Sequence, residues 1–130
     1  MFIDCSNLSS GPALPATTLN QWCYSSMFAN CSSLVTAPYL PATTLAKYCY
    51  YCMFYNCKSL TKSPTLPASA LVDWCYNSMF YGCENLTSIK CKFRNWSPAN
   101  ATTNWVTGID TEGVFYNNYV ETIHGVDNVP

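Results

Sequence analysis

The sequence is built on a short repeat of constant length, the interval that separates Met1 from Met27. The pair Met-Phe recurs at this interval, and a Cys and then a Leu follow each pair at fixed distances: Met1, Met27, Met53 and Met79, then Cys5, Cys31, Cys57 and Cys83, then Leu8, Leu34, Leu60 and Leu86. Three full repeats and a partial fourth are therefore present. A unit this short cannot bury its own apolar face, so neighbouring units must stack and share one continuous core. We therefore expect a solenoid.

Residues 34–40 are expected to be extended. Pro38 and Pro41 are excluded from a helix interior, and each favours extended backbone in the residue before it. The fourth copy shows the alternation of a strand most clearly. Its inward side chains are Leu86, Ile89, Cys91 and Phe93, and its outward side chains are Lys90, Lys92 and Arg94. Strands stacked at one period form a parallel sheet, and the return connections should be right-handed.

Residues 43–54 are expected to form a short helix. A threonine, Thr43 or Thr44, can cap the first turn. The apolar residues follow at the spacing of one helical face: Leu45, Cys49 and Met53, widened by Tyr50 and Phe54. Helices need more room than strands, so the parallel strands should lie on the concave side and the helices on the convex side. The predicted fold class is α/β, a right-handed repeat solenoid, and its core should include Phe28, Leu34, Met53, Phe54, Cys57 and Leu60.

The repeat pattern ends after residue 94. The remaining residues, 95–130, carry several large aromatic side chains and three glycines. The open end of a solenoid exposes its core and needs a cover. We therefore expect two parts, a solenoid over residues 1–94 and a C-terminal cap without repeats over residues 95–130. Met1 is in phase with the later Met-Phe pairs, so we also expect this sequence to be part of a longer chain.

The run Met-Phe-x-x-Cys-x-x-Leu, followed by Leu-Pro, resembles the BspA-type leucine-rich repeats of bacterial surface proteins, which carry Ala-Phe-x-x-Cys-x-x-Leu before an Ile-Pro step. The block Leu-Pro-Ala-Thr-Thr-Leu, at residues 14–19 and 40–45, is similar to a variant found in secreted or surface proteins of gut anaerobes. The segment Thr-Thr-Asn-Trp-Val at residues 102–106 is similar to one that closes such arrays. The resemblance implies a leucine-rich repeat solenoid in an extracellular or cell-surface setting. It implies adhesion or ligand binding only loosely.

Charge and hydropathy argue against two classes of partner. Only 10% of the residues are charged and the net charge is −1, without the clustered basic excess of a nucleic-acid-binding protein. No apolar run reaches the ~18 residues of a membrane-spanning helix. We therefore expect no nucleic-acid partner and no transmembrane segment.

The positions of the cysteines favour a packing role over metal binding or catalysis. Cys49 and Cys52 form a Cys-x-x-Cys pair, but structural zinc usually needs a second pair or histidines, and the only histidine is His124. Seven of the nine cysteines fall in two repeat slots, which favours small buried thiols, with a disulfide ladder as the alternative. No nucleophile or phosphate-loop motif is present. We expect no metal, no cofactor and no catalysis.

The aromatic residues carry the functional prediction. Three share one slot before the Cys-Tyr pair, and three more fall on the same outer face of the expected helix: Trp22, Tyr48 and Trp74, then Tyr51, Tyr55 and Tyr81. Such rows bind sugars or proteins in other repeat proteins. The alternative is that the rings pack sideways between neighbouring repeats. We predict a non-enzymatic segment that binds a protein or glycan, adhesin-like, on a bacterial or phage surface or secreted. The alternative function is a structural spacer that displays other domains.

Overall fold

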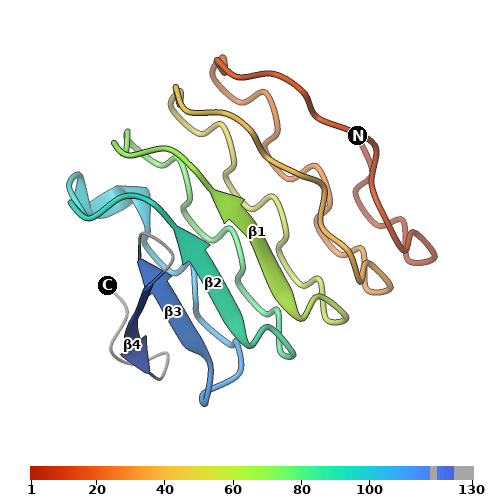
Figure 1. The fold of residues 1–130 in the computed structure, drawn as a ribbon. Coiled ribbons are helices and arrows are strands. Elements are labelled where there is room, and N and C mark those ends of the chain that lie inside the picture. Colours follow the sequence, from red (N-terminus) through yellow and green to blue (C-terminus); the bar gives the residue numbers. More distant parts are fainter. Residues whose placement is uncertain (118–119, 125–130) are drawn as a thin grey trace.

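The chain runs in successive circuits, each of which lies on the one before it (Figure 1). The computed structural model describes residues 1–117 and 120–124. It contains four strands and a short 3-10 helix: β1 (Lys62–Leu66), β2 (Ser88–Cys91), η1 (Ala99–Ala101), β3 (Val114–Asn117) and β4 (Val120–His124). The sheet order is β1-β2-β3-β4, in which β1, β2 and β3 are parallel and β4 is antiparallel to β3. Earlier circuits add isolated bridges to this layer, such as the one between Ser10 and Thr36.

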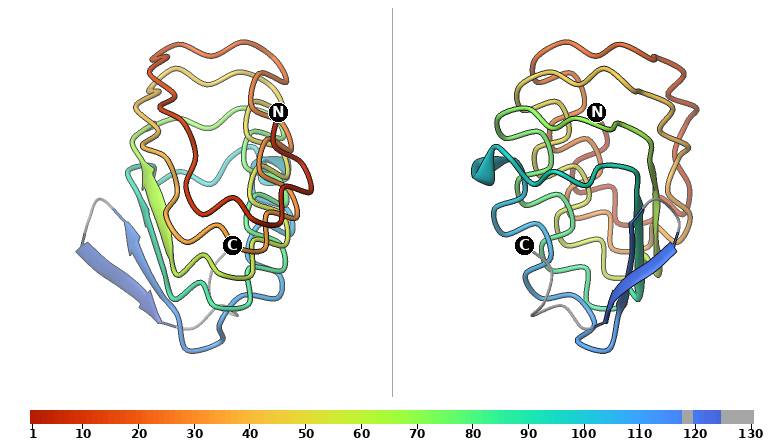
Figure 2. Two further views of the ribbon diagram at one scale, coloured as in Figure 1. Left: turned by 90° about the vertical axis from the view of Figure 1, so that its right-hand side faces the viewer. Right: turned by 60° about the vertical axis from the view of Figure 1, so that its left-hand side comes forward.

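A layer of turns faces the strands across the core (Figure 2). This turn layer comprises residues 20–31, 46–57, 72–83 and 101–109. Two kinds of backbone hydrogen bond alternate along it. The Cys49 N–H donates to the Ala46 carbonyl three residues back (3.1 Å), whereas the next N–H, that of Tyr50, donates to the Cys75 carbonyl of the following circuit (3.1 Å). Each circuit is thus a series of β-turns hydrogen-bonded to its neighbour through every second N–H group.

The prediction of a helix over residues 43–54 is therefore wrong. Tyr48, Cys52 and Asn56 have φ values of 61°, 53° and 57°, in the left-handed region that an α-helix excludes. A left-handed residue at every fourth position gives the turns a period of four. Over one short segment that period is hard to distinguish from the 3.6-residue period of a helix. The turns therefore bury the same residues that a helix over this segment would bury, although the backbone is not helical.

One of the left-handed slots is filled by residues that suit it. Its occupants are Asp4, Asn30, Asn56, Gly82 and Gly108, all with positive φ. Asp, Asn and Gly adopt this backbone more readily than other residues. The side chains also join the circuits, since Asn30 Nδ2 donates to Asp4 Oδ1 (2.8 Å) and Asn56 Nδ2 donates to Asn30 Oδ1 (3.2 Å).

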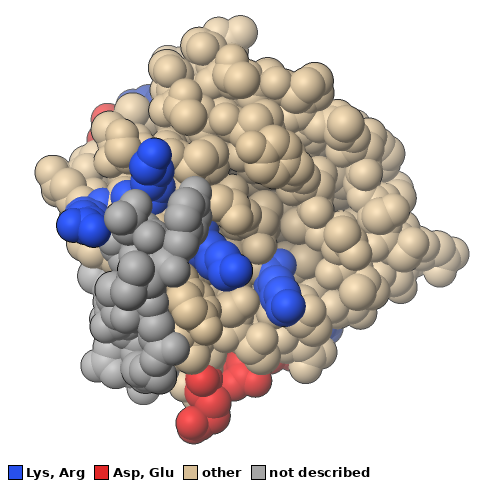
Figure 3. Space-filling view, viewed as in Figure 1, with Lys and Arg blue, Asp and Glu red and all other residues tan. Residues whose placement is uncertain are grey.

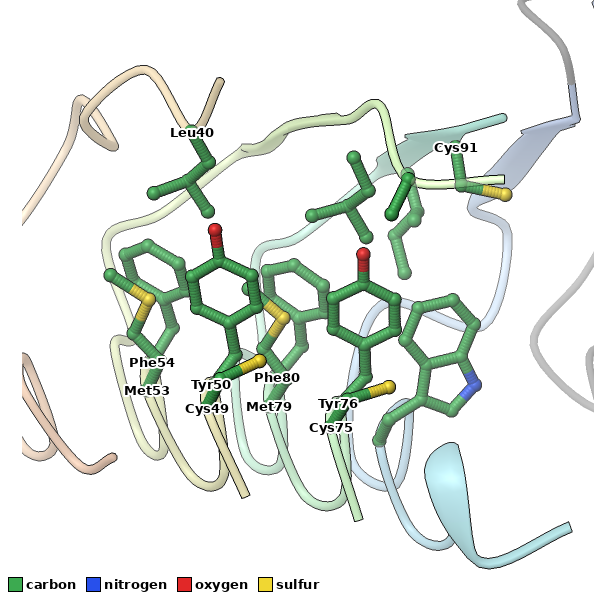
Figure 4. Close-up of a cluster of buried hydrophobic side chains, with 14 of the residues drawn as sticks. Leu40, Cys49, Tyr50, Met53, Phe54, Cys75, Tyr76, Met79, Phe80 and Cys91 are labelled. Carbon is green, nitrogen blue, oxygen red and sulfur yellow. The ribbon is translucent and has the colours of Figure 1, made fainter. Parts of the chain in front are cut away.

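The core lies between the strand layer and the turn layer. Every predicted core residue is fully buried, which confirms that part of the sequence analysis: Phe28, Leu34, Met53, Phe54, Cys57 and Leu60. The phenylalanine slot forms a column of nearly parallel rings, in which Phe54 lies 5.7 Å from Phe28. Phe80 lies 5.8 Å from Phe54 on the other side (Figure 4). A second column contains Tyr50 and Tyr76, 5.8 Å apart. The circuits therefore share one continuous core.

The strand predicted in the fourth copy is confirmed in its inward and outward alternation. Ile89, Cys91 and Phe93 are buried, whereas Lys90, Lys92 and Arg94 are exposed. The stacking also continues past residue 94, into the segment that we expected to be a cap. Ser88 pairs with Val114, one repeat interval later, and the Phe80 N–H donates to the Trp105 carbonyl (3.1 Å).

Candidate binding surfaces on the turn layer and the strand layer

The first of the two aromatic groups forms a stacked row along the turn layer. This aromatic row consists of Trp22, Tyr48 and Trp74, one from each of three successive circuits. The Trp22 and Tyr48 ring centroids are 3.9 Å apart with planes at 4°, and those of Tyr48 and Trp74 are 5.5 Å apart at 14°. Trp22 is 52% exposed, and the other two rings are half-buried. The row therefore lies at the surface and also joins the circuits.

The ring spacing differs from the one that the helix prediction implied. Packed helices would have separated the rings by ~8–10 Å. Because the circuits are hydrogen-bonded turns, they approach one another about as closely as strands do, ~4.8 Å. The central ring, Tyr48, is therefore covered on both faces by its neighbours. The edges of the rings remain for contact with a partner.

The other three aromatic residues divide between two places. Tyr51 lies edge-on to the row, with its centroid 6.0 Å from that of Trp22 and 5.7 Å from that of Tyr48. Tyr55 and Tyr81 stack on each other as a separate pair, 4.9 Å apart with planes at 3°. The structure thus gathers four of the six predicted residues and sets two beside them as a pair. Lys47 adds its ammonium group 5.7 Å from the Tyr48 ring centroid.

The backbone beneath the aromatic row is strained. Trp22, Tyr48 and Trp74 have φ values of 61°, 61° and 62°. A bulky residue held in the left-handed region costs of the order of 1–3 kcal/mol. Asparagine or glycine would fit the same backbone at lower cost, as the chain itself shows at Asn30 and Gly82. The folding of the backbone therefore does not explain why aromatic side chains occupy this slot.

The thiols are arranged for packing. All nine cysteines are free, and six of them are buried. Three of the buried thiols donate to a carbonyl of the preceding circuit; for example, Cys57 Sγ lies 3.1 Å from the Phe28 oxygen. Burial raises the pKa of Cys49 from 9.0 to about 12 and also raises the pKa of Cys52. Both members of the Cys-x-x-Cys pair are therefore protonated at neutral pH, a state that disfavours nucleophilic attack.

Metal ligands do not cluster in the described part of the chain. No group of three or more His, Cys, Asp or Glu side chains that could hold a metal ion occurs among the residues searched there. The side chain of His124, the only histidine, lies outside the described residues.

The strand layer carries a second surface, which the sequence analysis missed. Two neighbouring hollows, of about 350 and 330 Å³, lie over the strands and share Lys62 and Ser63 in their linings. We call the pair the strand groove. Lys and Arg side chains gather over β1 and β2 on this face (Figure 3). The outward positions of Lys90, Lys92 and Arg94 were the available signal in the sequence, but the repeat gives no equivalent basic residue in earlier copies.

No protein-family model, no curated protein and no solved structure matches the chain. Within the described residues, no helix has the length and apolar character needed to cross a membrane.

Proposed function

We propose that this chain is a non-enzymatic binding segment of a right-handed leucine-rich repeat solenoid of the BspA type, from a secreted or surface-exposed bacterial or phage protein. The slots that repeat at a constant interval support the architecture, together with backbone pairing at the same interval between Ser88 of β2 and Val114 of β3. The resemblance of the Met-Phe-x-x-Cys-x-x-Leu run supports the setting. The partner is a protein or a glycan.

The aromatic row carries the proposal. Its rings stay partly exposed and occupy a backbone slot that other residues would fill at lower cost. Tyrosine and tryptophan supply large contact areas and lose little side-chain entropy on binding. Since Tyr48 is covered on both faces, a partner would contact the ring edges and the polar atoms of Trp22, Tyr48 and Tyr51. A protein or glycan surface with matching acceptors and apolar patches fits this strip.

A structural spacer is the second candidate, and one observation favours it. The rings of the aromatic row stack at 3.9 and 5.5 Å, so part of their surface is used to hold circuits together. In a spacer, the row would stabilise the stack and no partner would bind to it.

Binding arrays with protein variants distinguish the two functions. The wild-type chain is screened against glycan and protein arrays, and each hit is measured again with Trp22→Ala and Trp74→Ala. The matched control is Tyr39→Ala, which removes an aromatic ring that is 72% exposed and lies outside the turn layer. A binding segment loses affinity in both tryptophan variants and keeps it in the control. If folded tryptophan variants bind every hit as the wild type does, or if no hit is found, the binding role of the row is wrong.

A further inference from the structure

The strand groove has a chemical character unlike that of the aromatic row. One hollow is lined by two lysines, three hydroxyl side chains and one tyrosine: Lys62, Lys90, Ser63, Thr65, Ser88 and Tyr116. The adjoining hollow adds two threonines, Thr36 and Thr61. No acidic side chain is among the described residues that line either hollow. The groove therefore offers positive charge and hydroxyl groups, and Val35, Ala37 and Pro64 add apolar surface in the adjoining hollow.

The charge on this face is concentrated. Four of the six basic residues of the chain belong to the strand layer or to the segment that leaves it: Lys62, Lys90, Lys92 and Arg94. All four are exposed. Of the other two, Lys58 is paired with Glu84 at 3.3 Å and Lys47 lies in the turn layer beside Tyr48. A chain with a net charge of −1 thus carries most of its positive charge beside one groove.

A change of register in β1 brings the two lysines into the same hollow. Lys62 pairs with Ser88, but Thr65 pairs with Lys90, so the register shifts by one residue between the two pairs. Ser63 fixes this irregularity, because its hydroxyl accepts a hydrogen bond from the Lys90 N–H (3.1 Å) and donates to the Pro64 carbonyl (2.9 Å). The Lys90 ammonium group lies 5.8 Å from the Tyr116 ring centroid. Lys90 is therefore held by both its backbone and its side chain.

We propose that the strand groove binds an acidic polysaccharide, that is, a saccharide chain bearing carboxylate or sulfate groups. Lys62 and Lys90 would pair with the anionic groups. The hydroxyls of Thr65 and Ser88 would exchange hydrogen bonds with sugar hydroxyls. Two hollows that share Lys62 suit an extended ligand with regularly repeated units.

Two other anionic partners fit less well. Nucleic acid is held mainly by many phosphate contacts, and this groove has only two lysines in its lining. An acidic peptide in extended form gains most of its affinity by pairing with a free strand edge. The groove lies instead across β1 and β2, which are hydrogen-bonded to each other. Hydroxyl side chains form the largest class in the lining, and they match a saccharide best.

The experiment measures binding of the full chain to polygalacturonate and to heparin, with dextran as the neutral polymer and duplex DNA and polyglutamate as the competing anions. We expect binding to at least one acidic polysaccharide that weakens with added salt, since exposed charges are screened. We also expect no binding to dextran, and binding to DNA and polyglutamate that is at least about tenfold weaker. If neither acidic polysaccharide binds, or if DNA or polyglutamate binds as tightly, the proposal is wrong.

Substitutions locate the site. Lys62→Gln and Lys90→Gln should each weaken polysaccharide binding about two- to fivefold, the effect expected of one exposed ion pair. Ser88→Ala removes a hydroxyl without changing charge. It should weaken the binding of polysaccharide and leave the binding of DNA and polyglutamate unchanged. Lys58→Gln makes the same change of net charge outside the groove and should have no effect. Equal losses in Lys58→Gln and in the groove variants would show attraction to overall charge and would overturn the site. Because the aromatic row takes no part here, this result stands apart from the array test.

Discussion

Removal of the ring at Phe54 measures how strongly the circuits are coupled. Phe54 is fully buried between Phe28 and Phe80, with centroids at 5.7 and 5.8 Å. A buried Phe→Ala substitution costs ~3–5 kcal/mol, and the cost rises when the cavity cannot collapse. Collapse is restricted here, because the Phe54 N–H donates to the Met79 carbonyl at 2.9 Å and this bond fixes the spacing of the circuits. We therefore expect Phe54→Ala to fall in the upper half of that range.

Phe2→Ala is the matched control for this prediction. Phe2 occupies the same slot, but it is only half-buried and has one ring neighbour in the column, Phe28, at 5.6 Å. Its loss should cost about 1–2 kcal/mol, in proportion to the smaller area removed from water. Urea unfolding followed by far-UV circular dichroism gives both free energies of unfolding. A cost below ~1 kcal/mol for Phe54→Ala, or a cost no larger than that of Phe2→Ala, would refute the stacked column.

Three further predictions concern the thiols and the left-handed slots. Thiol titration of the native protein should modify Cys5 and Cys23 quickly, because these two are exposed, and should reach all nine cysteines only after unfolding without reductant; a single reactive thiol after unfolding would indicate a disulfide ladder. The free energy of unfolding should fall as the pH rises from about 8 towards 12, because burial raises the pKa of Cys49 and Cys83 from 9.0 to about 12, so that only the unfolded state loses these protons in that window; urea unfolding at a series of pH values checks this, and a flat profile contradicts it. Asn56→Ala should destabilise the protein by about 1–2 kcal/mol and Asn56→Gly by less, because φ at this position is 57° and alanine resists that conformation; thermal melts give the order, and a more stable alanine variant would be inconsistent with the turn.

The sequence predicted the core well because burial follows side-chain identity. The slots of Phe28, Phe54 and Cys57 recur at a fixed interval, and an interval this short can be satisfied only by stacking. The helix prediction failed because a turn series with a period of four buries the same residues as a helix does. The column of Asp4, Asn30 and Gly82 was the signal for left-handed backbone, since these residue types tolerate positive φ.

The two candidate surfaces were predictable to different degrees. The outward direction of Trp22 and Tyr48 followed from the buried positions of their neighbours, but their spacing depended on the nature of the layer. The strand groove could not be predicted, because Lys62 and Lys90 occupy different positions of the repeat. They line the same hollow only because the register of β1 shifts between Lys62 and Thr65.

Scalar couplings across hydrogen bonds, measured by NMR, test the stacking of the turns most directly, because they identify the donor nitrogen and the acceptor carbonyl of each bond. We expect couplings from the nitrogen of Tyr50 to the carbonyl of Cys75 and from that of Phe54 to that of Met79, in both cases to the following circuit. These couplings would establish that the turns of successive circuits are stacked. Couplings from the nitrogen of Phe54 to the carbonyl of Tyr50, four residues back, would show a helix in this segment and would contradict the stacked turns.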